Sequence, residues 1–158
     1  MRYIPKQFFG IIFYYLKIVN KEKYKEFFFS FLKGIKNIDE EVKKFWEKSE
    51  KKIKEWYLIQ KNKNDVIISA SPEWLLKPIT EKLEINLIAT KIDKETGKFD
   101  SLNCYGKEKV KRFKEIFPNE EIENFYSDHY SDTPMFLISK NAWIVKGEKI
   151  NKWIDKKE

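Results

Sequence analysis

FYSDHYSDTPM (residues 125–135) is the most informative stretch of this chain. Its apolar start stops at Asp128, Asp132 follows four residues later, and a proline and a predicted helix come next. Two carboxylates at the carboxyl end of a strand suit a hard cation such as Mg²⁺, which takes oxygen ligands and completes its shell with water and phosphate. In open α/β sheets the ligand crevice lies just outside these strand ends. Alternatively, Asp128 or Asp132 merely caps the following helix, because Asp is favoured at that position.

Composition predicts one folded domain with a lysine-rich surface. At 158 residues the chain can bury a sizeable core, and its aromatic content of 16% argues against disorder. The net charge is +7, but nearly all positive charge is lysine, and 25 acidic residues are interspersed with it. The aromatic residues follow helical stripes and are not interleaved with basic residues on a strand face, as stacking platforms require. We therefore expect a solvated surface and no nucleic-acid partner.

Cysteine usage indicates a reducing compartment, and hydropathy argues against a membrane span. Cys104 is the only cysteine, so neither an internal disulfide nor a structural zinc cluster can form. The apolar residues 8–16, FFGIIFYYL, fall short of the roughly 20 residues that span a bilayer, and Lys17 interrupts them. We expect a buried helix there, a cytoplasmic protein and no membrane partner.

Helical periodicity dominates the first sixty residues, where we expect helices over 4–19, 22–33 and 38–60. Gly34 is a natural stop for the second helix, and Asn37 is a suitable N-cap for the third. One face of the third helix has apolar or small residues at three- and four-residue steps: Ile38, Val42, Phe45, Ser49, Ile53 and Trp56. This stripe is typical of a core face.

After residues 61–64 the pattern changes to strands that alternate with helices. We expect strands at 66–68, 87–89, 122–126 and 142–145. Helices are predicted at 72–83, with Ser71 as N-cap, at 107–117 and at 132–139, and a small hairpin at the turn 95–97. This alternation predicts a parallel sheet with helices on both faces.

Three residues in this half form a set that suits phosphate. Ser69 follows the first strand, Lys109 lies in the first turn of the helix from 107, and Asp128 follows a later strand. A hydroxyl and free backbone amides at a helix N-terminus can hold phosphate oxygens. A lysine and a carboxylate-bound Mg²⁺ can offset the growing negative charge.

The ordered segments IISASPE (67–73), CYGKEKVKRF (104–113) and FYSDHYSDTPM resemble the haloacid dehalogenase superfamily of phosphatases. The similarity is strongest to subclass IB, the phosphoserine phosphatase-like enzymes with a helical cap. It implies a Rossmann-like α/β core over residues 63–158, best matched at 65–150, preceded by a helical cap subdomain over residues 1–62.

The resemblance also implies roles for individual residues. Ser69 and Ala70 would bind phosphate, with Ser69 and Lys109 as the catalytic residues of the second and third motifs. Lys107 is the alternative to Lys109, which is preferred because a V-x-R-F pattern follows it. Asp128 would bind Mg²⁺, with Asp132 beside it at the metal site. His129 has no role in the motif, and we expect it to face solvent.

The chain departs from the family in its first motif, an Asp-x-Asp-x-Thr whose first Asp is the nucleophile. No Asp-x-Asp occurs in the 158 residues. In the family that motif ends the central strand, which precedes the cap, so the chain resembles a truncated member that begins inside its cap. Because buried strand edges need partners, we expect marginal stability, homo-oligomers or a distorted sheet.

Two functions follow from this sequence. The first is a magnesium-dependent phosphomonoester hydrolase that acts on a small phosphorylated metabolite through an aspartyl phosphate. The alternative is a non-catalytic protein that retains the fold and binds phosphate or a partner.

Overall fold

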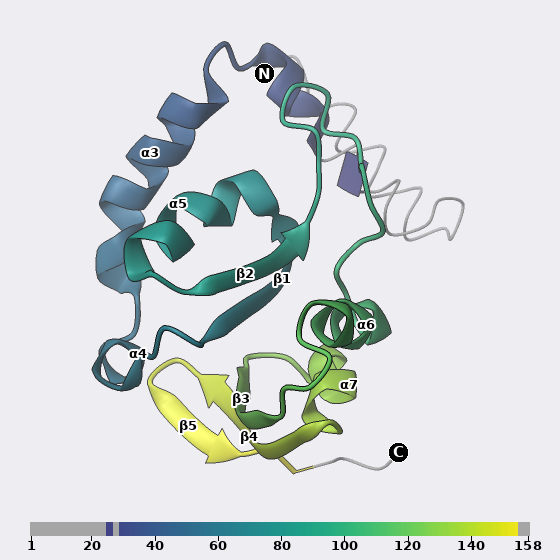
Figure 1. Cartoon of the computed structure of the whole chain (residues 1–158). Helices are drawn as coiled ribbons and strands as arrows, with labels where there is room; N and C mark the ends of the chain where they lie inside the picture. The colour runs from purple at the N-terminus through teal and green to yellow at the C-terminus, as the bar shows by residue number, and fades with distance from the viewer. Residues whose placement is uncertain (1–24, 27–28, 155–158) are drawn as a thin grey trace.

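The computed structural model describes residues 25–26 and 29–154 and has two small sheets joined by helices (Figure 1). The strands are β1 (Val66–Pro72), β2 (Asn86–Thr90), β3 (Ile122–Ser127), β4 (Ser139–Lys146) and β5 (Lys149–Lys152). The α-helices are α3 (Ile38–Ser49), α4 (Glu55–Gln60), α5 (Glu73–Leu83), α6 (Lys107–Ile116) and α7 (Thr133–Phe136). Single 3-10 turns are η1 (Ser30–Gly34), η2 (Glu50–Lys52) and η3 (Tyr130–Asp132).

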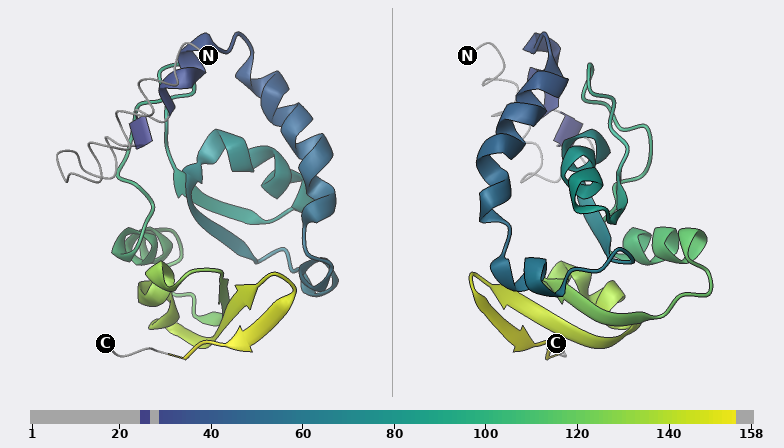
Figure 2. Two further views of the ribbon diagram at one scale, coloured as in Figure 1. Left: turned by 180° about the vertical axis from the view of Figure 1, so that it is seen from behind. Right: turned by 60° about the vertical axis from the view of Figure 1, so that its left-hand side comes forward.

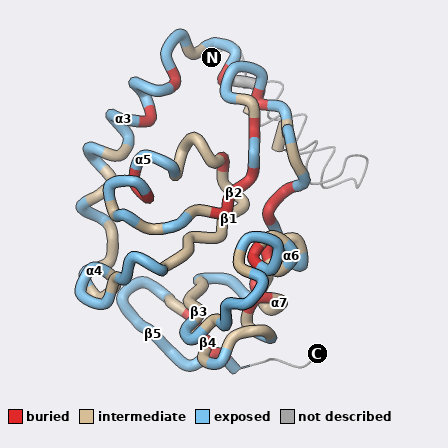
Figure 3. Tube along the Cα trace, in the orientation of Figure 1, coloured by how far each residue is buried: buried red, intermediate tan, exposed pale blue. Residues whose placement is uncertain are grey.

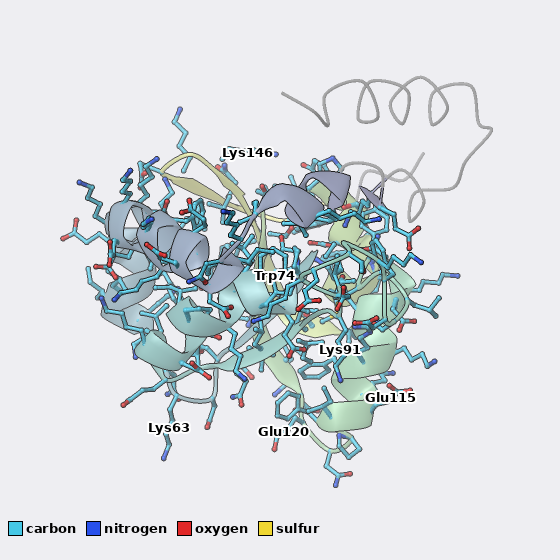
Figure 4. All side chains as sticks on the ribbon, turned by 90° about the horizontal axis from the view of Figure 1, so that it is seen from above. Lys63, Trp74, Lys91, Glu115, Glu120 and Lys146 are labelled. Atoms are coloured by element: carbon cyan, nitrogen blue, oxygen red, sulfur yellow. The ribbon has the colours of Figure 1, made fainter. Side chains whose placement is uncertain are left out.

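The first sheet pairs β1 with β2 in parallel, and two helices cover it. Ile67 and Ile68 align with Leu87 and Ile88 in the ladder. Helix α5 packs on both strands, and α3 lies outside α5. Trp46 of α3 donates its indole N–H to the Leu75 carbonyl at 2.6 Å, which fixes α3 on α5. Figure 4 shows Trp74, from the first turn of α5, near the centre of the molecule, whereas Lys63 and Glu120 project from its rim.

The second sheet has the order β3-β4-β5, with β3 parallel to β4 and β4 antiparallel to β5. Ala142 and Ile144 of β4 share a buried cluster with Trp153, which is 4% exposed. The Phe136 ring stacks on Trp153 with centroids 5.4 Å apart. Because α7 supplies Phe136, this cluster fixes the helix that follows the Asp128–Asp132 segment.

Helix α6 joins the two sheets through a shared core. Phe113 of α6, Ile88 of β2, Cys104 and Met135 of α7 form one buried cluster, and Ile68 of β1 packs against it. Arg112 adds a polar attachment, because its guanidinium donates to the Ala89 carbonyl of β2 at 2.8 Å and to the Leu102 carbonyl. The views in Figure 2 agree that α6 lies where the two sheets meet.

The sheet is in two pieces, which fits the expectation of a distorted sheet. Within the described residues, β1 pairs with no strand other than β2, and β3 with none other than β4. The arrows of β2 and β4 run in clearly different directions in Figure 1. All of β1 before Pro72 is half-buried despite its apolar run, as the tan tube in Figure 3 shows. A central strand of a parallel sheet is normally buried on both faces.

The single helix expected over 38–60 is wrong. Helix α3 ends at Ser49, η2 follows, and Ile53 and Lys54 adopt extended backbone with ψ near 133° and 130° before α4 begins. The break lets each part face a different core. Trp46 packs beside α5, whereas the Trp56 ring of α4 lies 5.1 Å from the Tyr126 ring of β3.

Several smaller expectations also differ. Ser71 is not the N-cap of α5, because β1 continues to Pro72, and Ser71 donates its backbone N–H to Ser69 Oγ. Helix α7 is only four residues long, since the preceding turn is the 3-10 segment η3. Strand β5 was not expected, although Gly147, with φ of 62°, makes the tight turn before it. The helix expected over 4–19 lies outside the described residues, as do residues 22–24 and 27–28 of the helix expected over 22–33, whose last turn is the 3-10 segment η1.

The remaining elements confirm the expected order. Strands β2, β3 and β4, helix α6 and the stop at Gly34 are found where the pattern predicts them, within a few residues. The turn near Gly97 closes a small hairpin through an antiparallel bridge between Ile92 and Phe99. The boundary between a cap at 1–62 and a core at 63–158 stays a prediction.

Candidate functional site

The loop after β3 is held by short-range hydrogen bonds. Ser127 is the last residue of β3, and its Oγ accepts the backbone N–H of His129 at 3.2 Å. The His129 side chain in turn accepts the N–H of Ser131 through Nδ1 at 2.9 Å. Thr133 caps the next turn by donating to the Tyr130 carbonyl at 2.7 Å. The loop therefore presents Asp128 outward and turns Asp132 inward.

Asp132 and Lys109 form a buried ion pair. Lys109 lies in the first turn of α6, its side chain is 9% exposed, and its Nζ is 2.7 Å from Asp132 Oδ1. The Asp132 side chain is 12% exposed. Charged groups are buried only when they are paired, because an isolated ion loses too much hydration. The pair therefore fixes the start of α6 against the loop after β3.

Gly106 and Arg112 determine how α6 presents Lys109. Gly106 stands just before α6 with φ of 57° and ψ of −125°, a conformation that side chains disfavour. Arg112 Nε pairs with Glu108 at 2.9 Å, and the guanidinium also binds β2. Helix α6 thus turns one face to β2 and brings Lys109 to the end of β3.

The two candidate lysines lie in different surroundings. Lys109 is buried beside Asp132, whereas Lys107 is exposed. The order of the residues in the helix accounts for this, since positions two apart on a helix face different directions. His129 is exposed, as expected.

Asp128 differs from Asp132 in its contacts. It is exposed, and its carboxylate makes no hydrogen bond or ion pair with any residue that the structure describes. Its backbone carbonyl accepts a hydrogen bond from Lys146 Nζ. Asp132, by contrast, has a donor on each carboxylate oxygen, because Ser127 Oγ lies 2.8 Å from Oδ2.

The residues fit Mg²⁺ in part. Within residues 25–26 and 29–154, no three His, Cys, Asp or Glu side chains are grouped so that they could hold a metal ion. The free carboxylate of Asp128 is the ligand these residues offer, and Mg²⁺ often takes one or two carboxylates with water and phosphate as its other ligands.

Ser69 and Ala70 lie in an irregular part of the β1–β2 ladder. The register shifts between Ile68 and Pro72. Ser69 Oγ accepts the N–H of Ser71 at 3.1 Å, so its own O–H remains able to donate. Among the described residues, Ser69 has no hydrogen bond to Lys109, Asp128 or Asp132. The structure brings Lys109 and Asp132 together, close in sequence to Asp128, and it leaves Ser69 and Ala70 in a second group.

Lys25 belongs to this second group, and sequence reasoning did not single it out. Its Nζ donates to the Ala70 carbonyl at 2.8 Å and to Asn103 Oδ1 at 3.0 Å. Thr90, at the end of β2, is fully buried and accepts the Cys104 N–H at 3.0 Å. Lys25 is one of many helical lysines, so no sequence signal distinguishes it. Ser127 was also missed, although a hydroxyl directly before Asp128 at a strand end was a usable signal.

Cys104 is a structural residue of this region. It is fully buried, and burial raises the pKa of its thiol more than the nearby Arg112 and Lys109 charges lower it. A thiol in this state is a poor nucleophile. The site therefore has carboxylates, hydroxyls and a lysine as its reactive groups.

Comparison with known proteins identifies the family. The sequence profile of haloacid dehalogenase-like hydrolases matches residues 1–137, which include Ser69, Lys109, Asp128 and Asp132. No curated protein and no solved structure matches the chain. No helix among the described residues combines the length and apolar character needed to cross a membrane. Since the match covers most of the sequence, the chain belongs to the haloacid dehalogenase-like hydrolase family.

Proposed function

We propose that the protein is a magnesium-dependent phosphomonoester hydrolase, similar to phosphoserine phosphatases, that acts on a small phosphorylated metabolite. The observation that carries the proposal is the buried Lys109–Asp132 pair, at 2.7 Å, four residues from the exposed carboxylate of Asp128. A fixed cation, together with a free carboxylate in the same loop as its partner, suits the transfer of a phosphoryl group, because this reaction depends mainly on positioning and charge stabilisation.

The residues have separate tasks in this proposal. The Lys109 ammonium offsets negative charge on the phosphoryl oxygens, and Ser69 donates its O–H to one of them. Asp128 would hold Mg²⁺, which would supply positive charge to offset the negative charge of the phosphate. Asp132 keeps Lys109 in position. The proposal requires that Ser69, Lys109 and Asp128 contact the same phosphate.

The reaction also needs a nucleophile. An aspartate oxygen would attack phosphorus, the alcohol would leave with a proton, and water would then hydrolyse the acyl phosphate. The 158 residues contain no Asp-x-Asp motif. The free edges of β1 and β3, among the described strands, are where a strand with this motif would join both sheets.

The test begins with the DNA directly upstream of Met1. If an in-frame strand ending in Asp-x-Asp-x-Thr is encoded there, we would assay that longer chain for phosphate release from a panel of phosphomonoesters, with Mg²⁺ and with EDTA. We expect Mg²⁺-dependent release that falls about 100-fold or more in Lys109→Met, a loss typical of one preorganised charge-stabilising group. Lys107→Met is the matched control and should stay near wild type. Metal-independent release, or equal losses in both variants, would contradict the proposal.

The alternative is a non-catalytic protein that retains the fold and binds phosphate or a partner. The observation that favours it is that no Asp-x-Asp motif within the 158 residues supplies the nucleophile. A closed reading frame upstream, with no phosphate release by the 158-residue chain in Mg²⁺, would support this alternative. Calorimetry with inorganic phosphate would then show whether Lys109→Met removes binding, as a phosphate-binding role requires.

A further inference from the structure

Both carboxylate oxygens of Asp132 receive a hydrogen-bond donor. Lys109 Nζ lies 2.7 Å from Oδ1, and Ser127 Oγ lies 2.8 Å from Oδ2. The two donors come from different elements, since Lys109 is in α6 and Ser127 ends β3. A carboxylate held at both oxygens cannot rotate without breaking a bond. Its plane is therefore fixed by Ser127 as much as by Lys109.

The direction of the Ser127 hydroxyl follows from its other contact. Ser127 Oγ accepts the His129 N–H at 3.2 Å, which leaves its one hydrogen to donate. Two acceptors are in range, Asp132 Oδ2 at 2.8 Å and the His129 carbonyl at 3.3 Å. A hydrogen bond to a charged acceptor is shorter and stronger than one to a neutral acceptor, so the hydroxyl donates to Asp132.

We propose that Ser127 is a positioning residue, which orients the Asp132 carboxylate and thereby holds the Lys109 ammonium at the end of β3. The role of Lys109 toward phosphate rests on the proposed function, whereas the positioning itself does not.

The experiment measures how well the ion pair protects Lys109 from acetylation, and it does not depend on catalysis. A short pulse of an acetylating reagent modifies lysines of the folded 158-residue chain, and mass spectrometry gives acetylation of Lys109 relative to Lys107. Lys107 is an exposed reference two residues away on α6. A buried, ion-paired ammonium reacts slowly, so a loosened pair raises this ratio.

The variants separate the effect of the Ser127 hydroxyl from the effect of side-chain size. Ser127→Thr and Ser127→Val have the same shape, but only threonine can donate to Asp132. We expect the ratio to rise about fivefold in Ser127→Val and Ser127→Ala, the factor that matches one net hydrogen bond of about 1 kcal/mol. It should stay near wild type in Ser127→Thr. Ser131→Ala, in the same loop, is the control and should also leave the ratio unchanged.

Two results would overturn the proposal. Equal ratios in Ser127→Thr and Ser127→Val would show that the hydroxyl does not hold the pair. A rise in Ser131→Ala as large as in Ser127→Ala would show general loosening of the loop. Thermal melting identifies the folded variants, and the threonine and valine pair gives the answer if Ser127→Ala does not fold. Because no turnover is needed, a chain without hydrolase activity still tests Ser127.

Discussion

The carboxyl ends of β1 and β3 carry the two halves of the candidate site, and they are held in different ways. At β3, Asp132 is locked between Lys109 and Ser127 through charged hydrogen bonds of 2.7 and 2.8 Å. At β1, the contact that reaches Ala70 is made by Lys25, from the N-terminal helical segment, to uncharged oxygens. The part of the site at β3 is therefore held in place by its own contacts. The position of the part at β1 depends instead on Lys25, which is distant in the sequence, and on what pairs with the free strand edges.

The largest expected effect is at the β3 half. Asp132→Ala leaves the Lys109 ammonium buried without its counter-charge, and it should lower the free energy of unfolding by about 3–5 kcal/mol. Urea denaturation followed by circular dichroism measures this. The double variant Lys109→Met with Asp132→Leu should recover most of the loss, because no charge is then left buried.

Lys111→Met is the control for Asp132→Ala, because Lys111 lies on α6, as Lys109 does, and forms an exposed pair with Glu115 at 3.8 Å. Exposed pairs contribute roughly 0–1 kcal/mol, so the control should change little. If Asp132→Ala costs no more than this control, the pair does not organise the β3 half.

The next effect distinguishes the core that joins the two sheets from the core beside α5. Met135 is fully buried in the cluster that α6 shares with both sheets, whereas Leu32, 2% exposed, packs with Ile38 and Val42 beside α5. Each change to alanine should cost about 2–5 kcal/mol. Hydrogen exchange should show that Met135→Ala lowers protection in β2 and β4 together, whereas Leu32→Ala lowers it mainly in α3 and α5. An equal loss of protection throughout the chain in both variants would mean that the two cores unfold as one unit.

The sequence predicts most elements of this fold because their signals are local. The strands near Ile88 and Phe125 have apolar runs, and α6 has its stripe, so their order was predictable. The break after Ser49 was not, because the three- and four-residue steps continue through Ile53 to Trp56. The cause of the break is tertiary, since Trp56 packs on Tyr126 of another sheet. Phe45 shows the same limit, because it lies on the predicted stripe and is 47% exposed.

The same limit applies to the candidate site: its local signals were readable in the sequence, and its long-range contacts were not. Asp128, Asp132 and Lys109 were predicted as site residues because they stand at strand and helix ends in a familiar order. The contact between Lys109 and Asp132 joins residues 23 positions apart, and no local pattern encodes it. Lys25 was missed for a related reason, because its partners Ala70 and Asn103 lie 45 and 78 positions away. A residue whose role depends on such contacts has the same sequence signal as a solvated lysine.

A moderate effect is expected at the β1 half. Lys25→Met removes two hydrogen bonds of a charged donor, and it should lower the free energy of unfolding by about 1–3 kcal/mol. Amide exchange should increase in residues 69–71 and 101–104 before it does in β3 or β4. Lys33→Met, an exposed neighbour on η1, is the control. Faster exchange in β3 of the Lys25 variant would show that the two halves are coupled, contrary to the comparison.

The smallest effect concerns pH and the pairing of β3 with β4. The hydrogen bonds that Lys140 donates to Glu121 and Glu123 raise the pKa of Lys140 from 10.5 to about 12, and the bond to Glu121 lowers the pKa of that carboxyl below 4.5. A raised lysine pKa adds stability that is present below pH 10.5 and is lost as pH rises through about 12. A lowered carboxyl pKa adds stability that is present above pH 4.5 and is lost as pH falls below it.

Thermal midpoints of wild type and Lys140→Met should therefore differ slightly near neutral pH and converge in strong acid. The difference must be small, because the three side chains are 52%, 76% and 65% exposed and solvent screens them. A difference that persists in strong acid would mean that the lysine stem, and not its charge, supports the strand pair.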